Sequence, residues 1–293
     1  MLEMKHVTKC FGDFKALDDL SLTVPRGAVY GLVGPNGAGK STAIRHLTGV
    51  YRPNAGEILM EGQPIYENDV IKARIGHIPD DIFFYPSATL EEMRRFYKGM
   101  YPKFDDALFH RLEEVFQLPK KGAIRRFSKG MQKQAAFQLT IASRPDVMIL
   151  DEPVDGLDPV MRRQVWSLIL SDVAQYETTV LVSSHNLREL EDVCDHVGIM
   201  DHGSMLLERS LADMQGATCK LQIVGDAPQD LQILHESNSG RLRTLVVRGS
   251  TDEVIAKAQQ AKPVYFDVLP LSLEEIFIYE LGGVNYEVKN IVL

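Results

Sequence analysis

Three short runs of apolar residues stand out in the pattern of hydrophobic and polar positions. They cover residues 28–33, 147–150 and 179–182. Continuous apolar runs of this length are typical of strands that are buried on both faces of a parallel sheet. The first run is followed by a glycine-rich stretch and by residues 40–47, which we expect to form a helix that ends at Gly49. This region is therefore predicted to be a strand, a loop and a helix.

Helix start signals lie between these strands. Thr89 and Glu92 have the spacing of a capping box, and Asp158 precedes a proline as an N-cap residue does. These signals predict one helix that runs toward residue 98 and another that runs toward residue 175. Residues 80–142 lack a strand pattern and are expected to form an inserted helical subdomain. Helices that alternate with buried strands predict an α/β fold with a parallel sheet.

The pattern changes after a turn at residues 201–204, which we expect to join two short strands. Strands are predicted at 219–224, 243–247 and 265–268, with a helix at 251–261 between the last two. A second capping box at Ser272 and Glu275 begins a final helix, expected to close at Gly282–Gly283. We therefore expect a large domain over residues 1–210 and a small α+β appendix over residues 216–293.

Composition narrows the class of protein. The chain has 293 residues, of which 45% are hydrophobic and 25% charged, as in soluble globular proteins with a full core. The formal charge is −8, from 32 Lys+Arg and 40 Asp+Glu, so no overall positive field is available to a nucleic acid backbone. We therefore expect no nucleic acid partner.

The cysteines and the apolar segments indicate in which cellular compartment the protein works. Cys10, Cys194 and Cys219 are odd in number and widely spaced, which favours reduced thiols in the cytosol over a disulfide framework or a zinc site. The first residues mix charges without an apolar core, and no apolar run reaches the 18 or so residues that a membrane span needs. We expect a cytoplasmic protein that works at a membrane only through a partner.

The glycine-rich stretch matches the P-loop pattern Gly34-x-x-x-x-Gly39-Lys40-Ser41. Glycines let successive backbone N–H groups turn toward phosphate oxygens, and the helix N-terminus adds partial positive charge. Lys40 would reach the β- and γ-phosphates, and the Ser41 hydroxyl would bind Mg²⁺. This predicts a P-loop core that binds a nucleoside triphosphate and Mg²⁺.

Two acids and a histidine follow the other buried strands. Asp151 would hold the Mg²⁺ shell, and Glu152 would polarise the water that attacks the γ-phosphate. His185 stands at the end of the third strand, where it would contact the γ-phosphate and that water. Ser128 begins a further helix as its N-cap, with Gly130 small enough for close backbone approach. This second anion-binding terminus is expected to serve a nucleotide on another copy.

These residues resemble the ATP-binding subunits of ABC transporters over roughly residues 1–208, since five motifs follow in the family's order. Walker A is residues 34–42, Walker B with its glutamate is 147–152, the D-loop is 156–158, the switch histidine is His185 and the signature is 127–131. The resemblance implies a head-to-tail dimer that closes on Mg-ATP and opens on hydrolysis, with Phe11 stacked on adenine; a core position for Phe11 is the alternative. The implied nucleotide contacts are Phe11, Gly34, Pro35, Asn36, Gly37, Ala38, Gly39, Lys40, Ser41, Thr42, Ser128, Lys129, Gly130 and Asp158, with Lys40, Glu152 and His185 in catalysis and Ser41, Asp151 and Asp80 at the metal.

The chain departs from the family pattern at two places. The signature reads Phe-Ser-Lys-Gly-Met, so that Lys129 adds a positive charge able to reach the opposite γ-phosphate. The Q-loop has Asp80 where the family usually has glutamine, which adds a negative charge beside the triphosphate and predicts unusual turnover or coupling. The tail resembles ABC-2 type exporter ATPases, including YtrB-like members, and so implies an exporter.

The resemblance implies two partners, a second ABC ATPase subunit, identical or different, and a polytopic transmembrane permease at the inner face of the cell membrane. The aromatic run at residues 82–86 is either the docking surface for that permease or an apolar wedge beneath the helical subdomain. Two other functions compete: a soluble ABC ATPase that acts on ribosomes or DNA, and a slow regulatory ATP-binding scaffold. The single P-loop and the lack of heptads count against the first, while the pair Asp151 and Glu152 counts against the second.

Overall fold

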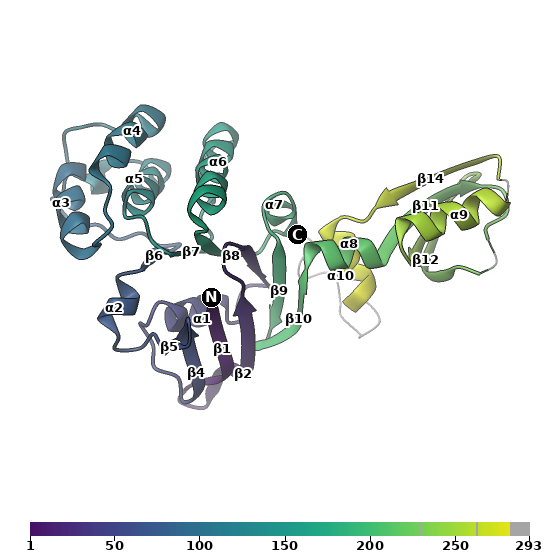
Figure 1. Cartoon of the computed structure of the whole chain (residues 1–293), viewed down its shortest axis with the longest axis horizontal. Helices are drawn as coiled ribbons and strands as arrows, with labels where there is room; N and C mark the ends of the chain where they lie inside the picture. The colour runs from purple at the N-terminus through teal and green to yellow at the C-terminus, as the bar shows by residue number, and fades with distance from the viewer. Residues whose placement is uncertain (229, 262, 282–293) are drawn as a thin grey trace. The chain divides into compact units, whose positions relative to one another are not determined.

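The computed structural model describes residues 1–228, 230–261 and 263–281, which fall into two compact units. The first unit comprises Met1–His185 and His196–Glu208, and the second comprises Asn186–Asp195 and the chain from Arg209. Figure 1 labels the elements of both units. The domain limits expected above, 1–210 and 216–293, stay a prediction.

A six-stranded sheet forms the centre of the first unit, with strand order β10-β9-β3-β8-β7-β6. Strands β6, β7, β8, β3 and β9 run parallel to one another. Every residue of β3, β7 and β8 is buried, which confirms the three predicted buried strands and the parallel sheet. The bounds are β3 Val29–Val33, β6 Ile75–Ile78, β7 Val147–Asp151, β8 Thr179–Ser184, β9 His196–Asp201 and β10 Ser204–Ser210.

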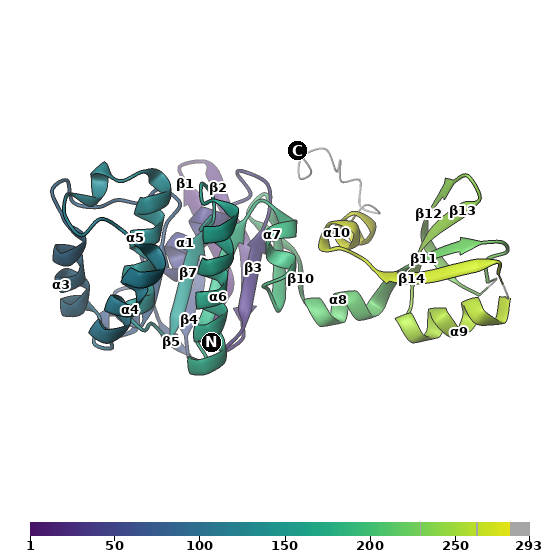
Figure 2. The same cartoon turned by 90° about the horizontal axis from the view of Figure 1, so that it is seen from above.

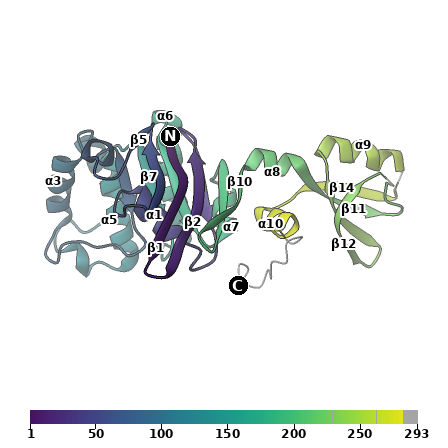
Figure 3. The same cartoon turned by 90° about the horizontal axis from the view of Figure 1, so that it is seen from below.

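A second, antiparallel sheet with strand order β2-β1-β4-β5 lies in the same unit (Figure 3). Helix α1, Lys40–Leu47, shares one hydrophobic core with both sheets, in which Ile44 packs with Leu20 and Ile149. The sequence analysis did not identify this sheet. Its strands are β1 Leu2–Phe11, β2 Phe14–Val24, β4 Ala55–Met60 and β5 Gln63–Pro64.

Helices fill residues 90–142, as predicted for the helical subdomain, and Figures 1 and 2 show α3, α4 and α5 grouped together. Thr89 and Glu92 form the reciprocal hydrogen bonds of a capping box, and Asp158 caps α6. Gln138 of α5 donates to the carbonyl of Phe109 on α4 over 3.1 Å, which ties the two helices together. The helical elements are α2 Asp69–Lys72, α3 Leu90–Met100, α4 Asp106–Phe116, the 3-10 turn Ile124–Arg126, α5 Lys129–Ala142 and α6 Pro159–Tyr176.

The second unit contains an antiparallel sheet with strand order β12-β13-β11-β14, and α9 packs on one of its faces (Figure 2). Cys219 and Leu221 of β11 pack with Val254 of α9 in its core. The predicted α+β character is confirmed, whereas α8 and β12 were missed. The elements are α7 Leu187–Glu191, α8 Leu211–Ala217, β11 Thr218–Val224, β12 Gln232–Ser239, β13 Leu242–Arg248, α9 Thr251–Ala261, β14 Tyr265–Pro270 and α10 Leu273–Leu281.

Three smaller expectations also meet the structure. Ser272 and Glu275 exchange the hydrogen bonds of the second capping box, while the expected helix end at Gly282–Gly283 lies outside the described residues. Cys10, Cys194 and Cys219 are free thiols. No helix within the described residues is both long enough and apolar enough to cross a membrane.

Candidate functional site

The loop between β3 and α1, residues 34–39, places backbone amide and carbonyl groups at the carboxyl end of β3. A Cβ atom on Gly34 would lie 2.3 Å from the Met200 carbonyl oxygen, so only glycine fits there. Gly39 has φ of +104° and is the N-cap of α1, and it leaves the first turn of the helix without a side-chain cap. The N-terminus of α1 therefore retains the amide donors and partial positive charge that favour an anion.

Lys40 is the first residue of α1 and is buried, with 7% of its surface exposed. Its ammonium donates to the carbonyl oxygens of Gly34 at 2.6 Å and Pro35 at 3.3 Å. Burial lowers the pKa of Lys40, and the carboxylates of Glu152 and Asp151 act in the opposite direction. The positive charge is thus held between the loop and the two acids that follow β7.

Asp151 ends β7 and is almost fully buried, with 7% exposure. The Ser183 hydroxyl of the neighbouring β8 donates to its carboxylate over 2.5 Å and accepts from the Glu152 amide over 3.1 Å. Asp151 and Ser183 are register partners in the parallel ladder. Ser183 was not among the predicted site residues, although a hydroxyl at the end of an apolar strand, beside the acid, was the available signal.

Glu152 and His185 approach each other across two strand ends. The distance between His185 Nδ1 and a Glu152 carboxylate oxygen is 3.0 Å. Burial raises the pKa of Glu152, whereas His185 and Lys40 lower it and the charge of Asp155 raises it further. Ligand atoms of Glu152, Asp155 and His185 all lie within 4.8 Å of one another, so Asp155 is a further neighbour that the sequence analysis missed.

One cavity of about 290 Å³ joins the loop to the acids. Most of the predicted phosphate and metal residues line it together, and Phe14 and Ala16 from β2 join them. Gly34 and Pro35 stand behind this lining, where their carbonyls hold Lys40. The lining residues are Phe14, Ala16, Asn36, Gly37, Ala38, Gly39, Lys40, Ser41, Thr42, Asp80, Asp151 and Glu152.

Phe11 does not line this cavity. It is 44% exposed, contacts the Tyr51 ring edge-on at a centroid distance of 5.5 Å, and pairs with Phe14 across β1 and β2. The core alternative for Phe11 is therefore wrong, because its side chain is not buried. Phe14, which is 65% exposed, is the aromatic residue that the structure brings to the loop cavity, and the sequence analysis missed it.

The signature residues lie apart from the loop cavity. Ser128 caps α5 and accepts from the Met131 amide over 3.3 Å, as predicted. A Cβ atom on Gly130 would lie 3.1 Å from the Gly156 carbonyl oxygen, so little space is left for a side chain there. The expected approach of the Gly130 backbone to a nucleotide on another copy stays a prediction. Asp158 accepts from the amides of the first turn of α6.

Lys129 lines a different cavity of about 390 Å³. Both signs of charge face this cavity, which touches the Q-loop, the start of α5 and the D-loop. Asp80 lines both this cavity and the loop cavity. Its lining residues are Asp80, Asp81, Ile82, Lys129, Gln132, Lys133, Asp155 and Gly156.

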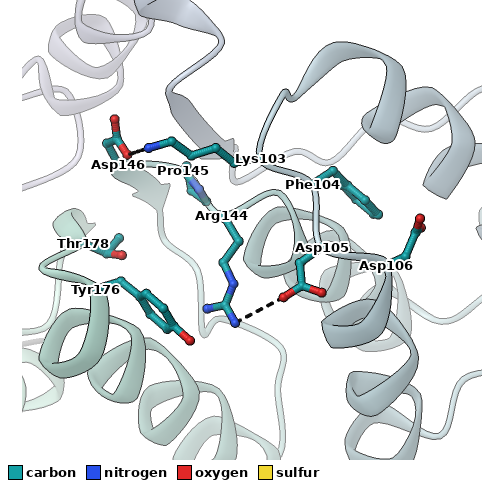
Figure 4. A pocket seen from close by; sticks show the side chains of 9 residues that line it. All are labelled: Lys103, Phe104, Asp105, Asp106, Arg144, Pro145, Asp146, Tyr176 and Thr178. Carbon is teal, nitrogen blue, oxygen red and sulfur yellow. Dashed lines mark hydrogen bonds and ion pairs between the residues drawn. The ribbon is translucent and has the colours of Figure 1, made fainter.

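A larger cavity of about 620 Å³ lies between the start of α4 and the end of α6 (Figure 4). Arg144 pairs there with Asp172 at 2.8 Å and Asp105 at 3.6 Å, and its guanidinium stacks on Tyr176. Lys103 is paired with Asp146. Since these charged side chains are already paired with one another, we interpret the cavity as a polar contact region between the helical subdomain and the core, not as a ligand site.

The aromatic run at residues 82–86 is divided between two environments. Phe84 is buried at 4% exposure, whereas Phe83 and Tyr85 are 72% and 54% exposed. The Tyr85 ring lies 6.0 Å from that of Phe96, which is itself 44% exposed on α3. Phe84 is therefore buried, while its neighbours form an exposed surface, which we name the aromatic patch: Phe83, Tyr85, Phe96 and Met100. Whether Phe84 acts as a wedge beneath the helical subdomain stays a hypothesis.

A parallel sheet, a P-loop that enters α1 and acids at the end of a neighbouring strand define a P-loop nucleotide-binding core with an inserted helical subdomain. The ABC transporter family model matches residues 17–155. ABC transporter ATP-binding protein YtrB of Bacillus subtilis (strain 168) is 31% identical over 97% of this chain and 99% of its own length. This chain therefore belongs to the family of ABC transporter ATP-binding proteins.

Further similarities agree with this membership. Bacitracin transport ATP-binding protein BcrA of Bacillus licheniformis is 35% identical over 71% of this chain and 69% of its own length. A solved structure of an ATP binding subunit of an ABC transporter has a TM-score of 0.69 and 29% identity, and covers 73% of this chain and 92% of its own. The dimeric structure of MJ0796, a bacterial ABC transporter cassette, shares the fold with a TM-score of 0.66 and 21% identity, over 72% of this chain and 99% of its own.

Proposed function

We propose that this chain is a Mg²⁺-dependent ATPase subunit that powers a membrane exporter. The observation that carries the proposal is the loop cavity, in which an uncapped helix N-terminus and a buried lysine face two acids. The helix N-terminus and the lysine are suited to bind a triphosphate, and an acid opposite them is suited to activate the attacking water.

The phosphates of ATP are assigned to the loop and the first turn of α1. Lys40 supplies the positive charge for the β- and γ-phosphates, and the main-chain amides supply neutral donors. Phe11 is assigned to adenine stacking, with Phe14 as the competing aromatic side chain, because both are exposed on the same strand pair. The loop residues assigned to the nucleotide are Gly34, Pro35, Asn36, Gly37, Ala38, Gly39, Lys40, Ser41 and Thr42.

The residues present fit Mg²⁺. Ser41 and Asp80 line the loop cavity with Asp151, whose carboxylate is already oriented by Ser183. Hydroxyl and carboxylate oxygens are the ligands that Mg²⁺ prefers, and it normally retains several waters. When bound, Mg²⁺ would offset negative charge on the phosphate oxygens. Ser41, Asp151 and Asp80 are proposed to hold it.

Glu152 is assigned the activation of water. Its carboxylate borders the cavity, and burial together with the raised pKa makes it a better proton acceptor than an exposed glutamate. His185 orients that carboxylate through the 3.0 Å contact and is proposed to contact the γ-phosphate. Lys40 offsets negative charge that develops on the phosphate during transfer.

A second ABC ATPase subunit, identical or different, is proposed to complete each site. Ser128, Lys129 and Gly130 do not line the loop cavity of their own chain, although they begin an anion-favouring helix. The dimeric cassette of MJ0796 supports such an assembly by its shared fold. In the dimer, the signature residues and Asp158 of one subunit would contact the nucleotide that is bound to the other subunit. The dimer would close when ATP binds and open after hydrolysis.

The permease is proposed to dock on the aromatic patch. Four large apolar side chains stand exposed on adjacent segments, Phe83 and Tyr85 before α3 and Phe96 and Met100 on it. An exposed apolar surface of this kind favours a protein partner. Docking there would hold the subunit at the cytoplasmic face of the membrane, with substrate recognition left to the permease.

Affinity purification tests the proposal. Tagged Glu152→Gln protein is isolated from its native cells in mild detergent with Mg-ATP, next to the same protein with the patch substitutions Phe83→Ser and Tyr85→Ser. A stoichiometric polytopic membrane protein that is lost with the patch variant is the expected result. Recovery of ribosomes or nucleic acid, from material that contains the membrane fraction, favours a soluble ABC ATPase. Recovery of the protein alone favours a regulatory ATP-binding scaffold.

A further inference from the structure

Lys133 is a buried lysine one turn into α5 for which the proposed chemistry has no use. Only 7% of its surface is exposed, and it reaches out of the helical subdomain to the end of β7. Its ammonium donates to the main-chain carbonyl of Glu152 over 2.7 Å. A buried ammonium is costly unless it is paired, so this contact and its neighbours must compensate for the burial.

The carboxylate of Asp80 lies 3.8 Å from the same ammonium. Asp80 is the acid at the Q-loop position, where the family usually has glutamine, and its side chain is 62% exposed at the edge of the loop cavity. The negative charge at this position therefore faces a positive charge from α5. The unusual residue of the Q-loop and the buried lysine form one charge pair.

The backbone of Glu152 is in a conformation that needs support. Its φ is +45°, in the left-handed region that non-glycine residues rarely occupy, and the next residue is Pro153. Ser183 holds the amide of Glu152, and Lys133 holds its carbonyl. Since the amide and the carbonyl of Glu152 are held by residues of β8 and α5, the direction of its side chain depends on both contacts.

We propose that Lys133 is a positioning residue that couples Asp80 of the Q-loop to the backbone of Glu152. This inference rests on the proposed function, because it assigns Glu152 the activation of water. When Asp80 holds the ammonium in place, the carbonyl of Glu152 is fixed and its carboxylate faces the cavity. When the helical subdomain or the Q-loop moves, Lys133 no longer donates to the carbonyl of Glu152. The carboxylate of Glu152 then no longer points into the loop cavity.

The test compares Lys133→Met with Lys98→Met in the full-length protein. Lys98 is an exposed lysine of the same subdomain and pairs with Asp106, which makes it a matched control. We expect Lys133→Met to lower kcat about tenfold while the Kd for ATP stays within about twofold, since a positioning contact acts on turnover more than on binding. Lys133→Gln, which keeps a donor, is expected to retain more activity than Lys133→Met.

Asp80→Asn tests the coupling. In protein without Mg²⁺, where Asp80 has no metal to bind, Asp80→Asn alone is expected to speed amide exchange at residues 151–157. In the Lys133→Met background it should have almost no further effect on that exchange, because the pair acts as a unit. Multiplicative effects of the two substitutions would overturn the coupling. A Lys133→Met protein with the kcat of the unchanged protein would overturn the proposal as a whole.

Hydrogen exchange gives a readout that needs no turnover. Lys133→Met should speed exchange at the amides of residues 151–157, and Lys98→Met should not. If the unchanged protein binds ATP without hydrolysing it, the proposed function fails, and the exchange result still decides the role of Lys133. Exchange that is the same in Lys133→Met and the unchanged protein would contradict the clamp on Glu152.

Discussion

Two helix N-termini carry the candidate chemistry of this chain, and they differ in how their donors are used. At α1, Gly39 provides no side-chain cap, and the first turn opens onto a cavity that is lined by a buried lysine and three acids. At α5, the Ser128 hydroxyl accepts from the Met131 amide, and Lys129 borders a second cavity. At the N-terminus of α1, the lysine and the acids expected at a nucleotide line the same cavity as the helix terminus. The cavity at the N-terminus of α5 does not contain these residues of the P-loop and of β7.

From this difference we propose that α1 anchors the nucleotide and that α5 contributes half of a site. A triphosphate at α1 finds donors, positive charge and metal-ligating oxygens in one place. An anion at α5 finds a helix terminus and Lys129, but Asp80 and Asp81 border the same cavity. The comparison therefore predicts that changes at the N-terminus of α1 affect ATP binding itself, and that changes at the N-terminus of α5 affect only steps that need a second subunit.

The largest expected effect lies beside the α1 terminus. Glu152→Gln should lower kcat by about 10²- to 10⁴-fold, because removal of a positioned proton acceptor has an effect of this size. The Kd for Mg-ATP should stay within a few-fold of the unchanged value. Steady-state turnover and titration with a fluorescent ATP analogue measure the two quantities. A Glu152→Gln protein that turns over normally would contradict the assignment of Glu152.

Lys40→Ala should weaken ATP binding by about 100-fold, since it removes a charge-assisted contact to the phosphates. The same titration measures this loss, with Lys98→Ala as an exposed-lysine control. An unchanged Kd for Lys40→Ala would remove α1 from the nucleotide site and reverse the comparison.

Ser128→Ala should lower kcat about tenfold and leave the Kd of the isolated subunit for ATP within about twofold. Thr89→Ala is its matched control, since Thr89 caps α3 in the same subdomain and either loss costs about 1 kcal/mol of stability. Thr89→Ala should keep kcat within about twofold. Equal effects of the two substitutions would mean that Ser128 only caps its helix.

The acid limb of the turnover profile should follow Glu152. Because burial raises its pKa, activity should fall on acidification at a higher pH than an ordinary glutamate would give. His185 lowers the same pKa, so His185→Ala should move the acid limb to still higher pH. Profiles of kcat against pH for the two proteins test this, and a limb that moves to lower pH would contradict it.

The smallest effect concerns the adenine. Phe11→Ala should weaken ATP several-fold through lost stacking, while inorganic triphosphate should bind as before. Phe14→Ala is the competing variant on the paired strand. If Phe14→Ala weakens ATP and Phe11→Ala does not, adenine stacks on the residue that lines the loop cavity.

The sequence predicted those parts of the fold that have a local signature. Apolar runs identified β3, β7 and β8, and capping residues identified the starts of α3, α6 and α10. The antiparallel sheet escaped because its strands mix buried and exposed positions with irregular register, as between Met4 and Val7. Strand β12 is exposed along nearly all of its length and so has no hydrophobic pattern to find.

The site divides in the same way. The P-loop and the acids of β7 were predictable because short motifs carry them. Ser183 had only a weak signal, a hydroxyl at the end of an apolar strand, and Lys133 had none, because their roles arise from contacts between segments that are distant in the chain. In the sequence, Asp80 was noted only as a departure from the family pattern. Its ion-pair partner Lys133 could be identified only from the structure, in which α5 lies beside the Q-loop.

Sedimentation of Glu152→Gln protein with Mg-ATP tests the shared site most directly, with Glu152→Gln/Ser128→Ala as the matched variant. The account predicts that the Glu152→Gln protein forms a dimer with one ATP bound per subunit. The double variant is predicted to bind ATP as a monomer. Glu152→Gln protein that is saturated with ATP and stays monomeric would contradict a site completed by a second copy of this chain.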